Sequence, residues 1–212
     1  MSSTLTQKMS NPGDAAIGIA ECSDRRVPPR DRIITSAIEL FRQHGIKGIG
    51  VDAIADAADS NKMTLYRHFG SKDDLVCECL RQVSARGEQT WRDLENAYPQ
   101  DPMGQLHGWV QQAAEGVFDD PHGCDLANAA VELKEASHPA HKVIMEAKKA
   151  HMERLSDLCR RAGIEQHERL ADALVLLAEG ARVCRQSVGS NGPQQRLKQT
   201  CEAMIAAFSP KP

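Results

Sequence analysis

The chain has 212 residues, of which 41% are hydrophobic, 26% charged and 4% aromatic. Such a composition is ordinary for a globular chain of one or two domains with a sizeable core. No stretch approaches the roughly 18 consecutive apolar residues of a membrane-spanning helix. Pro12, Gly13 and Asp14 interrupt the amino-terminal region before an apolar leader can build. We therefore expect a cytoplasmic protein with no membrane segment.

The small formal net charge of −3 conceals an uneven distribution. Residues 25–72 contain nine basic and five acidic side chains, a net of +4, which leaves −7 for the rest of the chain. A basic segment attached to an acidic remainder would orient that segment toward a polyanion.

The first elements in chain order are an arm and two helices. Residues 1–29 are rich in Ser, Thr, Gly and Pro without an apolar period, which predicts a flexible arm. From Asp31 to Gly45, apolar residues recur with the spacing of an amphipathic helix. A short helix is predicted over residues 51–58, with Gly50 as a weak N-cap.

A turn and two further helices follow. The sequence Asp59-Ser60-Asn61 is typical of a turn, because Asp and Asn tolerate left-handed backbone and cap helices. The third helix is predicted over residues 62–69. Ser71 is the expected N-cap of a fourth, which we extend to about Leu94. Residues 30–76 therefore form a predicted helix-turn-helix domain of three helices.

The remaining residues, 77–212, also have helical patterns, with breaks near residues 99–102, 119–123, 137–139, 163 and 189–193. No segment alternates apolar and polar residues as a strand would, so the predicted fold is all-α. Two late helices have strong apolar stripes, one over residues 170–181 and one over 197–208, and we expect Pro193 to open the second.

The third helix has two distinct faces. Leu65 and Phe69 lie four residues apart and can anchor it. The opposite face presents hydrogen-bond donors, one aromatic ring and positive charge, which suit DNA phosphates and base edges. Its members are Lys62, Thr64, Tyr66, Arg67 and His68. Lys72 lies at the start of the fourth helix, where free amides also favour an anion.

This segment resembles the TetR/AcrR family of one-component transcriptional repressors. Ten positions match its pattern: Ile54, Ala55, Ala57, Ala58, Thr64, Leu65, Tyr66, Phe69, Lys72 and Leu75. By resemblance, Thr64, Tyr66 and Lys72 contact phosphates, and Lys62, Met63, Arg67 and His68 supply base contacts. Arg25, Arg26 and Arg30 are either a basic arm that reaches DNA or a solubilising tail.

The resemblance also implies a ligand-binding and dimerisation domain over residues 77–212. In the family, the last two helices pair two subunits on a pseudo-palindromic operator, and a small molecule bound among the middle helices releases the DNA. Aromatic and soft side chains with one amide are our candidates for lining that site. These candidates are Trp109, Phe118, Cys124, Asn128 and Met145.

Other kinds of chemistry have weak signals. The odd number of seven cysteines, without repeated CxxC spacing, indicates neither a disulfide framework nor a zinc finger, and we expect most to be buried. His138, His141 and His151 have no convincing metal-ligand spacing. No catalytic Ser elbow, phosphate loop or HExxH occurs, so we expect no enzyme, cofactor or metal. The alternative is a helical small-molecule-binding or enzymatic protein without a DNA role.

Overall fold

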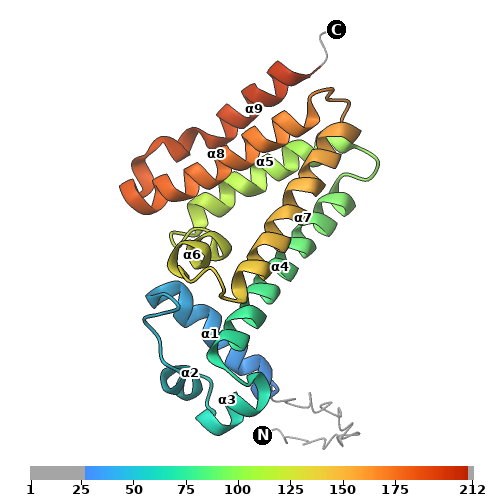
Figure 1. The fold of residues 1–212 in the computed structure, drawn as a ribbon. Helices are drawn as coiled ribbons and strands as arrows, with labels where there is room; N and C mark the ends of the chain where they lie inside the picture. The colour runs from blue at the N-terminus through green and yellow to red at the C-terminus, as the bar shows by residue number, and fades with distance from the viewer. Residues whose placement is uncertain (1–26, 210–212) are drawn as a thin grey trace, which may run out of the picture.

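The computed structural model describes residues 27–209, which are helical throughout and contain no strand (Figure 1). Its elements are α1 (Pro29–His44), α2 (Val51–Ala57), α3 (Lys62–Phe69), α4 (Lys72–Ala97), α5 (Pro102–Asp119), α6 (Asp125–Glu132), α7 (Ala140–Arg161), α8 (His167–Val188), the 3-10 turns η1 (Gly189–Asn191) and η2 (Pro193–Arg196), and α9 (Leu197–Phe208). The all-α prediction is confirmed. Within this part of the chain, no helix combines the length and apolarity needed to cross a membrane.

The helices form a small head and a larger body (Figure 1). The head consists of α1, α2, α3 and the beginning of α4, and its core includes Ile34, Ile54 and Leu65. The body contains the rest of α4 with α5, α7, α8 and α9, around a core that includes Trp109, Leu155 and Leu174. Each part therefore has its own apolar core, as an independently packed unit requires.

A third apolar cluster joins the head to the body. Ile46 follows α1, Val76 and Leu80 come from α4, and Ala129 and Ile144 come from α6 and α7. Because α4 is continuous across residues 76 and 77, the predicted domain boundary at that point passes through a helix that both parts share.

Several predicted boundaries need correction. The first helix begins at Pro29, inside the predicted arm, because proline fits the first turn of a helix, where its missing N–H is not needed. Residues 1–26 of that arm lie outside the described residues. Pro193 opens η2, and the last helix begins only at Leu197. Cys77, Cys79, Cys159 and Cys201 are buried, as expected.

Candidate nucleic-acid interface

Local hydrogen bonds fix the direction of α3. Asp59 adopts the left-handed backbone expected of the turn, with φ of 46°. The Asn61 side chain accepts the Thr64 amide at 2.8 Å and caps the helix as predicted. Arg32, which sequence reasoning missed, donates to the carbonyls of Ala58 and Asp59 at 2.9 and 2.7 Å. The end of α2 and the turn are therefore both tied to α1.

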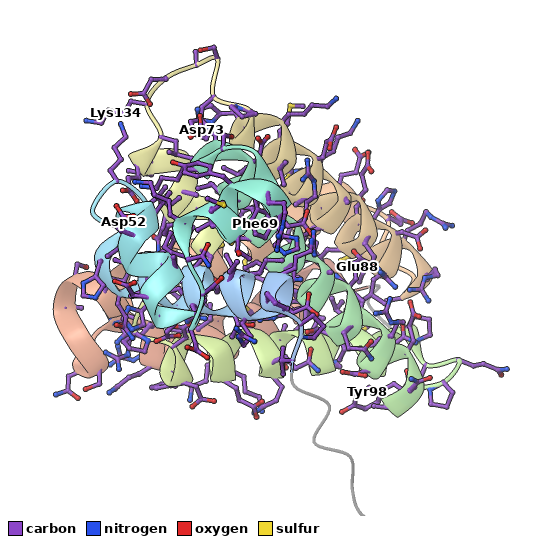
Figure 2. The ribbon with its side chains drawn as sticks, turned by 90° about the horizontal axis from the view of Figure 1, so that it is seen from below. Asp52, Phe69, Asp73, Glu88, Tyr98 and Lys134 are labelled. Carbon is purple, nitrogen blue, oxygen red and sulfur yellow. The ribbon has the colours of Figure 1, made fainter. Side chains whose placement is uncertain are left out.

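The two predicted faces of α3 are confirmed. Leu65 and Phe69 are buried in the head core. The opposite face is open at the end of the molecule, where Figure 2 looks onto α2 and α3, marked by its labels Asp52 and Phe69. Its exposed members are Lys62, Met63, Tyr66, Arg67 and His68, with Thr64 half-buried. This face is therefore available to a macromolecular partner.

The basic side chains on this face have few ionic partners within residues 27–209. Lys62 Nζ lies 3.1 Å from the Asp52 carboxylate, and both side chains are more than half exposed. Such surface pairs contribute about 1 kcal/mol or less. Neither Arg67 nor His68 forms an ion pair within residues 27–209. The face can exchange these contacts for phosphate contacts at little cost.

Lys72 is engaged inside the protein. Its ammonium donates to the carbonyl of Ile46 at 2.6 Å and to that of Ile49, so it holds the loop between α1 and α2. Burial lowers the pKa of Lys72. The predicted phosphate contact therefore depends on the third ammonium proton, and a substitution at Lys72 would also disturb the loop.

The Arg30 side chain also makes contacts inside the head. It donates to Glu78 at 2.7 Å, and its guanidinium lies 5.6 Å from the centre of the Phe69 ring. This hydrogen bond lowers the pKa of Glu78. Arg30 therefore clamps α1 to α4 over the end of α3, and in this conformation it does not extend as an arm. Arg25 and Arg26 lie outside the described residues.

A polar latch, formed by Glu132, Arg42 and their partners, connects the head to α6. Glu132, the last residue of α6, accepts the amide of Ile46 at 2.9 Å and that of Lys47 at 2.6 Å. Arg42 of α1 pairs with Asp120 and, at 3.7 Å, with Asp125. The sequence signal for Glu132 is only an acid at the end of a short helix, which did not identify this role.

The body contains a cavity of about 280 Å³ between α4, α5, α7 and α8, adjoined by another of about 150 Å³ that reaches α6. Trp109 lines the first and Cys124 the second, as predicted for a ligand site. Phe118 and Met145 are instead 43% and 62% exposed. Trp109 and Phe118 are nine residues apart on α5, so they lie on opposite faces of the helix. Asn128 instead lines a small cavity between α1, α4 and α6, where the head meets the body.

Most of the residues that line the two cavities are not among those predicted from the sequence. Trp91 and His151 line both parts, with ring centres 5.5 Å apart, together with Glu179 and Arg182. Burial, aided by the nearby cations Lys148 and Arg182, lowers the pKa of His151 and favours its neutral form. These side chains come from three helices, so no local motif marks them.

The three histidines considered for a metal site are not brought together. His138 lies 3.4 Å from Asp73, and its ring centre is 6.4 Å from that of His141. His151 faces the tryptophans in the body cavity. Residues 27–209 contain no cluster of three or more His, Cys, Asp or Glu side chains arranged to hold a metal.

A three-helix head with an open, capped α3, joined to a larger helical body with a cavity, is the arrangement of a helix-turn-helix domain on a helical body. Comparison with known proteins identifies the family that the head resembles. Residues 33–79 match the model of bacterial regulatory proteins of the tetR family. The chain is 33% identical to the HTH-type transcriptional repressor SCO4008 of Streptomyces coelicolor, over 38% of each chain. It thus matches less than two thirds of that relative's length.

Solved structures extend the similarity over the body. SCO4454, a TetR-family transcriptional regulator from Streptomyces coelicolor, superposes with a TM-score of 0.75 at 24% identity, over 86% of this chain and 96% of that one. CifR, a TetR-family regulator solved with operator DNA as a cysteine mutant, gives 0.70 at 20% identity, over 85% and 97%. At these identities the likeness concerns the fold. The match to the tetR family model itself covers residues 33–79.

Proposed function

We propose that this protein is a DNA-binding transcriptional regulator, a repressor that binds a pseudo-palindromic operator as a homodimer and is released by a small molecule. The observation that carries the proposal is the open face of α3, where Lys62, Tyr66 and Arg67 are exposed while Leu65 and Phe69 anchor the helix. The names of the relatives and the operator complex of CifR support it.

Selection of bound DNA from a random pool tests this function. We expect a palindrome whose half-sites are one helical turn or a multiple of it apart, about 34 to 36 Å per turn. Affinity for that palindrome should fall steeply with salt, because each neutralised phosphate releases a counterion. A protein that enriches no sequence and shows no salt-dependent DNA binding would instead be the helical binding protein or enzyme that we consider as the alternative.

The proposed dimer uses a surface of α8 and α9. On α8, Leu176 and Val183 are 72% and 60% exposed, although both are large and apolar. Gly180 lies between them on the same face and permits close helix approach. On α9, Ala203 and Ala207 are exposed, and their small side chains also permit close approach. An apolar stripe of this kind fits a second copy of the same two helices across a two-fold axis.

Leu176→Arg is expected to convert the dimer to a monomer, because two like charges would meet near the symmetry axis. Operator affinity should then fall by about 100-fold or more, since one half-site is lost from each binding event. Sedimentation equilibrium and band-shift measurements check the two effects. Leu176 is not part of the core, so the circular dichroism spectrum should be unchanged. A variant that remains dimeric would refute this interface.

The effector is proposed to bind in the body cavity and to act on the head through α6. The cavity reaches the start of α6, where Lys148 Nζ lies 3.3 Å from Cys124 Sγ, and the end of α6 holds the head through Glu132. A shift of α6 would therefore move the loop after α1. We expect no enzymatic activity or cofactor, and, as a regulator of chromosomal DNA, the protein is expected in the cytoplasm.

A further inference from the structure

The body cavity contains polar groups whose hydrogen-bonding capacity is unused. The side-chain oxygen of Gln112 is buried there without a partner. Buried amides are normally satisfied, and leaving one unpaired costs about 1–3 kcal/mol. Arg182 also lines the cavity, and its ionic contact within residues 27–209 is with Glu179 at 3.5 Å on its own helix. The Gln112 oxygen can therefore accept a hydrogen bond from a donor in the cavity, whereas Arg182 can donate to an anion there.

The apolar part of the cavity is mainly aromatic. Trp91 from α4 and Trp109 from α5 approach the His151 ring to 5.5 and 6.1 Å between ring centres. These are the only two tryptophans in the chain. Arg154 lies over the Trp91 ring, 5.3 Å from its centre, so a ligand can contact only the parts of the two indoles that line the cavity. A planar ring packed there would gain about 0.5–1.5 kcal/mol beyond the burial of its area.

The two acids that line the cavities, Glu88 and Glu179, each already have a cationic partner besides Arg182. Lys148 from α7 pairs with Glu179 at 2.6 Å, so this acid is shared between Lys148 and Arg182. Glu88 from α4, labelled in Figure 2, pairs with Arg154 at 2.5 Å, and Arg154 also pairs with Glu95 at 3.0 Å. Arg182 therefore shares its one carboxylate partner with Lys148. Its planar guanidinium can form a bidentate ion pair with a second carboxylate.

We propose that the body cavity binds an aromatic carboxylic acid, with its ring against Trp91 and Trp109 and its carboxylate on Arg182. This inference rests on the proposed function, because it specifies the chemical class of the effector. The ring accounts for the aromatic walls, and the carboxylate provides the second ionic partner that the Arg182 guanidinium can take.

Isothermal titration calorimetry of the whole protein without DNA tests this assignment. Benzoate, cinnamate and naphthoate are the acidic probes. Cinnamyl alcohol keeps the ring without the charge, and cyclohexanecarboxylate keeps the charge without the ring. At least one aromatic acid should bind about tenfold more tightly than either of these controls, because hydrogen bonds to charged groups contribute about 1.5–3 kcal/mol. No binding by any of the three acids, or equal binding of cinnamate and cinnamyl alcohol, would overturn the proposal.

Two variants locate the site. Arg182→Gln should weaken binding of the acid by about 10- to 100-fold and leave the alcohol unaffected. Arg169→Gln, an exposed change of the same charge on α8, should alter neither.

Gly87 lines both cavities, and a Cβ added there meets nothing within 4 Å. Gly87→Met should therefore block binding without a clash, while Gly116→Met, at an equally open position on α5, should not. Acid binding that survives both Arg182→Gln and Gly87→Met would place the ligand elsewhere.

The ligand class and the regulatory function can fail separately. A protein that selects a palindrome but binds none of the acids remains a regulator, and only the ligand class is wrong. A protein that binds an acid at Arg182 but selects no DNA has the proposed cavity ligand without the proposed function. For a protein that does both, the acid should release the selected DNA in a band-shift assay.

Discussion

The double variant Lys62→Ala/Arg67→Ala is expected to lose about 100-fold or more in operator affinity. Each side chain lies on the open face of α3, and contacts to bases contribute about 1–3 kcal/mol each. Stability should change little, because Lys62 has only an exposed partner and Arg67 has no ion pair within residues 27–209. Band-shift titration at fixed salt, with thermal unfolding of the same samples, measures both quantities.

Lys149→Ala/Arg160→Ala is the matched control for this experiment. It removes the same charge from exposed positions on α7, in the body. If DNA binding depended only on total charge, both double variants would weaken it equally, and the role of α3 would be refuted. Lys72 is unsuitable for such a test, because its removal also deprives the Ile46 and Ile49 carbonyls of their donor.

Glu132→Ala is expected to lower the free energy of unfolding by about 2 kcal/mol and to loosen the loop after α1. Glu132 accepts two backbone amides, those of Ile46 and Lys47, and hydrogen bonds to a charged group contribute about 1.5–3 kcal/mol. For a chain of this size, such a loss lowers the melting temperature by roughly 4–8 °C. Urea denaturation measures the stability, and hydrogen exchange at these two amides should accelerate by about tenfold or more.

Glu135→Ala provides the comparison within the same joint. Glu135 also reaches this loop, but only through an exposed ion pair with the Lys47 side chain at 3.1 Å, and it bonds neither amide. Its removal should leave stability and exchange nearly unchanged. Equal effects of the two substitutions would show that the latch is only surface charge and that Glu132 has no special part in connecting α6 to the head.

The sequence by itself determined the helices and the exposed side of α3. The signals for these features are local: the apolar spacing of Leu65 and Phe69, the caps at Asn61 and Ser71, and the helix-ending Gly70. Such signals act between residues a few positions apart, where helix geometry already fixes which side chains share a face. The identity of the exposed residues of α3 therefore followed without the tertiary structure.

Only the tertiary structure decided which groups meet across the fold. Lys72 is predicted to be a phosphate ligand, but its ammonium is held by carbonyls 23 and 26 residues away. Glu132 binds amides 86 and 85 residues away, and Trp91, Trp109 and His151 form one cavity from three different helices. Contacts at such separations depend on how the helices pack and cross, which periodicity does not specify. The exposed face of α3 could therefore be predicted, whereas the latch and the cavity chemistry could not.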